Sequence, residues 1–368
     1  MAARCAAAGR QNNEDNFQLS DNLADDQWGF VTGKEVDLGE KGALLVVCDG
    51  MGGMNAGATA SDLAVKTAKE WFSNDRLTPQ VTASPDTMLL YVEQVIIAAD
   101  NKIKETGNQN PEQTGMGSTI VLAWLFETNV YVGWCGDSRA YRYNAASGLE
   151  RLSHDHSYVQ ELVDSGKLSK ELAFDHPDTN IITRSLGDVR QQVKPDVKHF
   201  ALMDGDVLLL CTDGLHGVLR DVEIESIIAN NTDTLENCRN ALWTESQQAG
   251  WTDNVTIALC QVISGAGTVE KPAPETPAIE TAKPIIIKRK SSGILTIILT
   301  LLLGVAGFVG YMAVTRGWFA KPLDQQDTPI APANEADSTK LVNETSYTLL
   351  ISPEQQNTSY EPSTGYTF

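Results

Sequence analysis

Two segments in the first third of the chain carry apolar residues at helical spacing. Their apolar or small positions are Ala60, Leu63, Ala64, Thr67, Ala68 and Trp71 in one segment, and Leu89, Val92, Val95, Ile96, Ala99 and Ile103 in the other. Spacing of i, i+3 and i+4 places such side chains on one face of an α-helix. We therefore predict two amphipathic helices here, and a second batch of helices between Asp221 and about Ala249.

Five other segments are short, apolar and rich in β-branched residues. They read ALLVVCDG, STIVLAW, NVYVGWCGD, DVLLLCTDG and NVTIALCQV, and most are bounded by Gly, Asp or Asn, which is typical of core strands. Because the helices occur in two batches and do not alternate strictly with these strands, the pattern favours an α+β fold with mostly antiparallel sheets over a doubly wound parallel sheet. We predict one such domain over residues 1–263.

A longer apolar segment follows this domain. No residue between Lys290 and Arg316 is charged, and Ile294–Val314 is rich in Leu, Ile, Val, Gly and Ala. As a helix, that stretch reaches about 31 Å, roughly the thickness of a bilayer's hydrocarbon core. We predict a transmembrane helix over residues 291–315, a Pro/Glu/Thr-rich disordered linker over 264–290, and a short polar tail over 316–368 that is expected to be disordered.

Charge around the apolar segment predicts its orientation. Four basic residues precede it within residues 283–290, and Arg316 and Lys321 follow it. The positive-inside rule then places the domain over 1–263 in the cytoplasm and the tail outside the cell membrane, as a single-pass protein. The N-terminal MAARCAAAGR lacks the leucine-rich core of a secretory signal, which agrees. Gly304, Gly307 and Gly310 offer a helix face for weak self-association.

The net charge of −20 and the pI near 4.6 come from acidic residues spread along the whole chain. No sustained basic face is available for a polyanion, so nucleic acid is excluded as a partner. The six cysteines form no CxxC pair and mostly lie in apolar runs, which indicates small buried side chains in a reducing compartment.

Acidic residues gather at the predicted strand ends. Three strands end in an aspartate beside a glycine, at Asp49-Gly50, Gly136-Asp137 and Asp213-Gly214. The full acidic set adds residues from NNEDN and TDN and comprises Glu14, Asp15, Asp49, Asp137, Asp213 and Asp253. If the strand ends converge, these carboxylates repel one another and need bound cations. Oxygen ligands without supporting His or Cys favour Mg²⁺ or Mn²⁺, and several carboxylates favour more than one ion.

The chemistry of such a pair of ions suggests a reaction. Two hard cations lower the pKa of a bridging water and offset charge during in-line displacement at phosphorus. Arg10 precedes the NED acids, and its planar guanidinium suits two phosphate oxygens. Together these features predict a phosphomonoesterase.

The order of motifs is more specific still. GRQNNEDN, DGMGG, GMGSTIV, GDSRAYR, SHDHSYV, HPDTNIITRSLG, TDGLHG and TDNVT follow one another between about Arg10 and Val262. This order closely resembles the metal-dependent serine/threonine protein phosphatases of type 2C, in their bacterial form. The resemblance implies a β-sandwich of two antiparallel sheets flanked by pairs of antiparallel helices, with metals in a cleft at one end. It also implies hydrolysis of phosphoserine and phosphothreonine in proteins by a metal-bridged hydroxide, opposing a cognate serine/threonine kinase.

The resemblance also assigns metal ligands. Two ions, Mn²⁺ or Mg²⁺, are expected, with Asp49 bridging both. The Gly50 carbonyl and Glu14 are directed to one ion, and Asp213 and Asp253 to the other.

Four further residues receive roles from the same resemblance. Asp15 acts beside Glu14 directly or through bound water, and Asp137 with Asp213 supports a third, weaker ion. Arg10 matches the phosphate-binding arginine. The segment from about Tyr158 to Asn180 matches a mobile flap over the active site, and His176 at its end matches a histidine near the substrate.

The proton donor departs from the eukaryotic pattern. Where those relatives carry a histidine after the first DG, this chain has Met51. A metal-bound water is our first candidate for the general acid and His176 the second. His154 and His156 flank Asp155, and we interpret SHDHS as a loop held by hydrogen bonds.

Three other functions compete with this one. A pseudophosphatase that binds phosphoproteins without cleaving them would have lost a metal ligand, and no core ligand is lost. A calcium-dependent structural protein would need an exported domain and closely spaced DxDxDG loops, and neither is present. DGMGGMNAG lacks the Lys-Ser or Lys-Thr of a nucleotide-binding loop.

Overall fold

A computed structural model describes residues 1–25, 28–53 and 55–267. These residues lie in one compact unit, Met1–Ala278. The predicted transmembrane helix over 291–315, the tail over 316–368 and nearly all of the linker lie outside the described residues. Within the described ranges, no helix has the length and apolar character that crossing a bilayer requires.

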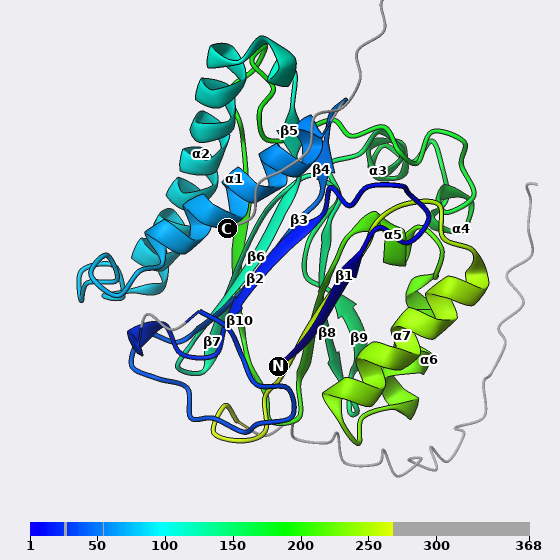
Figure 1. Ribbon diagram of the computed structural model, residues 1–368. Helices are drawn as coiled ribbons and strands as arrows, with labels where there is room; N and C mark the ends of the chain where they lie inside the picture. Colours follow the sequence, from blue (N-terminus) through cyan, green and yellow to red (C-terminus); the bar gives the residue numbers. More distant parts are fainter. Residues whose placement is uncertain (26–27, 54, 268–368) are drawn as a thin grey trace, which may run out of the picture. The chain divides into compact units, whose positions relative to one another are not determined.

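Two antiparallel sheets form the centre of the fold (Figure 1). In order across the first sheet, the strands are β1 (Ala2–Ala6), β12 (Val255–Gln261), β11 (Val207–Cys211), β8 (Arg139–Asn144) and β9 (Gly148–Arg151). In order across the second, they are β10 (Asp196–Ala201), β7 (Asn129–Cys135), β6 (Ile120–Phe126), β3 (Ala43–Cys48) and β2 (Asn16–Ser20). A small third sheet pairs β4 (Gly50–Met51) with β5 (Gly117–Ser118).

Helices cover the outer faces of the two sheets. Figure 1 shows α1 (Ala56–Trp71) and α2 (Pro85–Gln109) on one side of the sandwich, and α6 (Asp221–Asn230) and α7 (Leu235–Ala249) on the other. The shorter α3 (Tyr158–Asp164), α4 (Lys170–Ala173) and α5 (Asp213–His216) lie at one end of the sheets. Two 3-10 turns occupy Leu23–Asp25 and Pro111–Gln113. The predicted α+β fold with antiparallel sheets and both predicted batches of helices are confirmed.

The core lies in three layers, and the central strands contribute to two of them. Along β11, Val207, Leu209 and Cys211 pack under α6 and α7, whereas Leu208 and Leu210 pack between the sheets. Successive side chains of a strand point to opposite faces, so a strand buried on both faces is apolar throughout. This explains the uninterrupted apolar runs in the sequence. α1 and α2 close the third layer over the second sheet.

Besides the two-residue strands β4 and β5, five strands of the described residues were not predicted from the sequence: β1, β2, β8, β9 and β10. Each has a weaker pattern than the five predicted core strands, which all appear as β3, β6, β7, β11 and β12. β1 has the sequence AARCA and pairs with β12 in the register Ala2 to Leu259. The predicted domain end at residue 263 follows the last residue of β12 and stays a prediction.

Candidate functional site

Three of the predicted acids lie at the ends of neighbouring core strands. Asp49 directly follows β3, Asp137 follows β7 after one glycine, and Asp213 begins α5 after β11. Burial raises the pKa of Asp49 well above its ordinary value, and the negative charges of Asp15, Asp213, Asp137 and Asp253 raise it further. The neighbouring Asp49 side chain in turn limits the rise that burial causes in the pKa of Asp213. Because Coulombic interactions of this kind require short distances, the fold brings these acids together.

Burial also raises the pKa values of three other aspartates at the site. It raises the pKa of Asp15 to about 7, and that of Asp213 to about 6 with a further contribution from Asp253. The pKa of Asp137 is raised well above its ordinary value by burial and then by Asp213. Thr212 Oγ1 and Thr256 Oγ1 donate hydrogen bonds to Asp15 Oδ2 at 2.9 and 2.7 Å, which limits the rise for Asp15.

Glu14 is held at the site by its backbone and by two glycines. Its N–H donates to Asn254 Oδ1 at 2.8 Å, and its carbonyl accepts from Gly50 N–H at 3.2 Å. A Cβ on Gly57 would lie 2.7 Å from the carboxyl carbon of Glu14, and a Cβ on Gly50 would lie 2.1 Å from the Gly57 carbonyl oxygen. No side chain fits at either glycine without displacing Glu14 or α1. Sequence reasoning missed Gly57, because one glycine among several in DGMGGMNAG carries no separate signal.

Arg10 contacts the site through Asp253. Its Nε and Nη2 donate to the two carboxylate oxygens at 3.0 and 2.6 Å, in the bidentate geometry that guanidinium favours. The Arg10 side chain is nevertheless 57% exposed, so one face of it is open to solvent. The predicted phosphate ligand therefore lies beside a predicted metal ligand.

Two unpartnered carboxylate oxygens are the observation that fits hard cations at this site. Among the residues that the structure describes, Asp15 Oδ1 and Asp213 Oδ1 are buried and accept no hydrogen bond. A buried carboxylate oxygen without a partner is costly unless a cation compensates it. Across these same ranges, no three His, Cys, Asp or Glu side chains are already arranged as a cation cage. The geometry agrees with that finding, because Asp253 faces Arg10 and Asp15 faces two hydroxyls.

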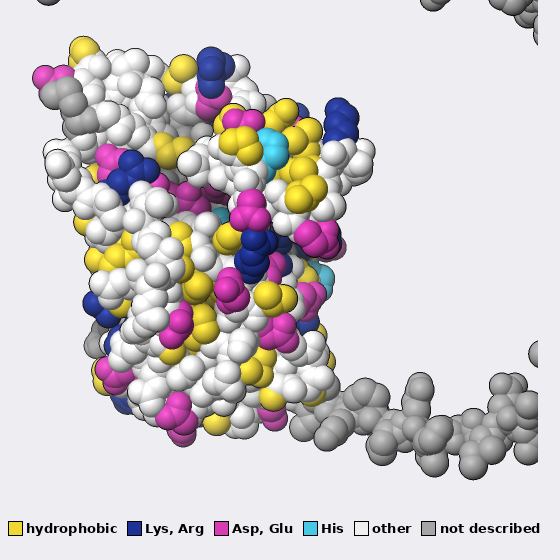
Figure 2. Space-filling model, turned by 90° about the vertical axis from the view of Figure 1, so that its right-hand side faces the viewer, with side chains coloured by type: hydrophobic (Ala, Val, Ile, Leu, Met, Phe, Trp, Pro, Cys, Tyr) yellow, Lys and Arg dark blue, Asp and Glu magenta, His cyan; other side chains and the backbone are white. Residues whose placement is uncertain are grey.

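A cleft of about 990 Å³ is lined by three of the predicted acids and by residues of the segment over 158–180, which we call the flap. Its acidic end is lined by Asp137, Asp213 and Asp253, with Arg10 beside them. Phe174 of the flap also lines the cleft. Figure 2 shows acidic and basic side chains gathered in the hollowed part of this surface. The cleft is large enough for a peptide side chain together with its neighbours.

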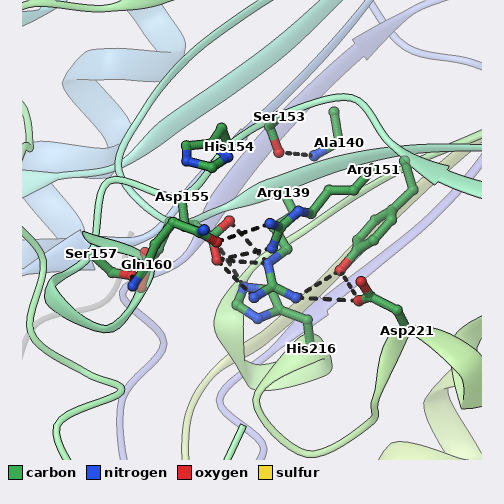
Figure 3. Close-up of polar contacts among 12 residues, drawn as sticks. Arg139, Ala140, Arg151, Ser153, His154, Asp155, Ser157, Gln160, His216 and Asp221 are labelled. Atoms are coloured by element: carbon green, nitrogen blue, oxygen red, sulfur yellow. Dashed lines mark hydrogen bonds and ion pairs between the residues drawn. The ribbon is translucent and has the colours of Figure 1, made fainter. Parts of the chain in front are cut away.

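One wall of the cleft is a network of buried charges that joins two sequence motifs (Figure 3). Arg139 from GDSRAYR donates three hydrogen bonds to Asp155 from SHDHS, the shortest at 2.7 Å. Arg139 Nη1 also donates to the Tyr141 hydroxyl oxygen, which itself donates to Asp221 at 2.8 Å. His156 Nδ1 accepts from the Gly136 N–H at 3.2 Å. The interpretation of SHDHS as a hydrogen-bonded loop is therefore confirmed.

His216 is a further residue whose role sequence reasoning missed. It is buried in α5, and burial lowers its pKa to about 3. The ring is therefore neutral at physiological pH, and its Nε2–H donates to the carbonyl oxygen of Asp137 at 3.0 Å. This contact fixes the backbone of one predicted metal ligand. The motif TDGLHG contained the residue but gave no sign of its partner.

His176 lies in the flap but does not line the cleft. Its Nδ1 accepts from the Asp178 N–H at 3.1 Å, and its ring contacts Tyr158 edge-on with centroids 6.4 Å apart. In this arrangement the imidazole stabilises a turn of the flap. Its expected role near the substrate stays a prediction.

Comparison with known proteins identifies the family. The family model of protein phosphatase 2C matches residues 19–247. A protein of Listeria innocua named serine/threonine phosphatase stp is 32% identical over 222 residues, which are 60% of this chain and 85% of that protein.

Solved structures have the same fold. The S. agalactiae serine/threonine phosphatase is 30% identical with a TM-score of 0.59, covering 71% of this chain and 98% of that chain. The catalytic domain of the phosphatase PstP, solved in complex with two manganese ions, is 26% identical with a TM-score of 0.57, covering 72% of this chain and 97% of that chain. With the acidic site and the matched family model, these similarities establish that the chain belongs to the protein phosphatase 2C family of serine/threonine phosphatases.

Proposed function

We propose that this chain removes phosphate from phosphoserine and phosphothreonine in other proteins, with two Mn²⁺ or Mg²⁺ ions as cofactors. The observation that carries the proposal is the environment of Asp49, whose carboxyl group is buried among four other aspartates. Such a cluster serves no structural purpose that apolar residues would not serve better, and it suits hard cations. Phosphoryl transfer is one of the reactions that paired cations of this kind support.

The predicted acidic residues would bind the metal ions. Asp49, Asp213, Asp253, Glu14 and the Gly50 carbonyl would hold the two ions, with Asp15 supporting Glu14. When bound, the ions supply an activated water and neutralise charge on the phosphoryl group.

Residues around this set orient the substrate and the ligands. Arg10 offers the open face of its guanidinium to phosphate oxygens at the mouth of the cleft. His216 holds the backbone of Asp137, which would support the third ion. Water or His176 would return the proton to the leaving oxygen.

A direct assay tests the function. The purified full-length protein should hydrolyse para-nitrophenyl phosphate and a phosphothreonine peptide in millimolar Mn²⁺, and lose the activity in excess chelator because the carboxylates alone activate no water. Adding Mn²⁺ back should restore it. Full activity in chelator would contradict the two-metal proposal. Binding of the phosphopeptide without release of phosphate at any metal concentration would favour the pseudophosphatase.

We also infer that the catalytic domain is tethered to the cytoplasmic face of the cell membrane, where it would meet membrane-associated serine/threonine kinases and their substrates. The uncharged stretch Ile294–Val314 and the four basic residues that precede it support this proposal. Protease added outside intact cells should trim the tail over 316–368 and spare the catalytic domain. Lysed cells provide the control, because there the protease also reaches exposed loops of the domain. Digestion of the catalytic domain in intact cells would reverse the proposed orientation.

A further inference from the structure

Arg220 joins the flap to the part of the molecule that carries Asp213. It directly precedes α6 and lines the cleft, as Phe174 of the flap does. Its Nη2 donates to Asp175 Oδ2 at 2.7 Å. Its guanidinium carbon lies 4.1 Å from the centroid of the Phe174 ring. One side chain thus makes an ion pair and a cation–π contact with two consecutive flap residues.

The rest of the flap is attached at its base. Tyr158 N–H donates to the Ile181 carbonyl and Thr183 N–H to the His156 carbonyl, each at 2.8 Å, so the two ends of the flap are held together. Among the described residues, the hydrogen bonds of residues 165–177 stay within the flap, apart from the one that Arg220 donates to Asp175. The α4 part of the flap therefore depends on Arg220 for its polar attachment to the body.

We propose that Arg220 is a positioning residue that holds the α4 part of the flap beside the cleft and thereby favours protein substrates over small phosphate esters. The proposal rests on the proposed phosphatase function. A phosphopeptide has residues on both sides of the phosphorylated one, and these must lie along the cleft between flap and body. A small ester needs the acidic end of the cleft, which strands β3, β7 and β11 hold independently of the flap.

The size of the expected effect follows from the exposure of the contacts. The side chains of Arg220 and Asp175 are 41% and 68% exposed, and ion pairs at such sites are weak singly. A cation–π contact on the same guanidinium adds a comparable amount. Both contacts are weak, and they attach only the α4 part of the flap. Their loss should therefore release this part locally without unfolding the domain.

The test compares two substrates in variants of the full-length protein. For Arg220→Met, which keeps an apolar side chain of similar reach, the ratio of kcat/KM on a phosphothreonine peptide to kcat/KM on para-nitrophenyl phosphate should fall about three- to tenfold. The change should come mainly from the KM for the peptide. Asp175→Asn should produce part of this fall, because it breaks the ion pair and leaves the contact between Arg220 and Phe174. The double variant should match Arg220→Met, because the two substitutions break the same ion pair. Arg220→Lys should retain an intermediate ratio, since lysine keeps the charge but not the planar stack.

Arg190→Met is the matched control. Arg190 also forms an ion pair with a nearby aspartate, Asp188, at 2.8 Å, but it does not line the cleft. For Arg190→Met, the ratio of kcat/KM on the peptide to kcat/KM on para-nitrophenyl phosphate should equal that of the wild type. If Arg220→Met keeps the wild-type ratio, or lowers both activities equally, the positioning role is wrong although the phosphatase function stands. If the wild-type protein releases phosphate from neither substrate, the proposed function itself fails.

Discussion

Replacing Asp213 by asparagine should lower phosphatase activity by about a thousandfold or more while leaving the domain folded. The carboxyl group of Asp213 is buried beside those of Asp49 and Asp137, and its charge raises the pKa of both. A neutral amide of the same shape binds a divalent cation poorly, and the phosphoryl group then loses the charge that stabilises its transfer. Hydrolysis of para-nitrophenyl phosphate in Mn²⁺ is the measurement.

The same substitution should not destabilise the metal-free protein. Asparagine removes one of several mutually repelling charges, so the midpoint of thermal unfolding in chelator should equal or exceed that of the wild type. Asp62→Asn is a suitable control, because Asp62 pairs with Lys66 on the surface of α1 and should leave activity unchanged. If the Asp213 variant retained more than about a tenth of the activity, this carboxylate would not belong to the essential set.

Without divalent cations, the protein should become less stable as the pH rises from about 4 to about 7. The folded-state pKa values of Asp15 and Asp213 are raised to about 7 and about 6, and those of Asp49 and Asp137 are raised well above their ordinary values. In the unfolded chain these aspartates have an ordinary pKa of about 4. Between that pH and the raised folded-state pKa values, the folded state binds more protons than the unfolded chain, so it loses stability as the pH rises. The predicted loss is a few kcal/mol, equivalent to a fall in Tm of about 5–10 °C.

Manganese should reverse this pH dependence. Millimolar Mn²⁺ at pH 7 binds the ionised carboxylates of the folded state and not the unfolded chain, so it should raise Tm above the value in chelator. At pH 4 protons compete for the same oxygens, and Mn²⁺ should have little effect. In chelator, Asp213→Asn should show a weaker dependence on pH than the wild type. A Tm in chelator that stays constant or rises between pH 4 and 7 would show that the carboxylates do not form a repelling cluster.

The strands that were predicted correctly share one property. β3, β6, β7, β11 and β12 are covered on both faces, so each needs a continuous apolar run that is visible in the sequence. The strands that were not predicted lack such a continuous apolar run. β10 has the sequence DVKHFA, is partly exposed and pairs with β7 alone, so its pattern resembles a loop. Its strand conformation follows from the partner beside it and not from its own composition.

The sequence by itself determined the α+β class, the two batches of helices, the central strands and the acidic residues at their ends, because periodicity and composition are local properties. Tertiary structure alone decided that Arg139 faces Asp155, that His216 holds the Asp137 carbonyl, that Gly57 leaves room for Glu14, and that Arg220 meets the flap. Those contacts join residues far apart in the chain or depend on a close approach of backbones. Their energies depend on distance and burial, which exist only after the sheets have packed.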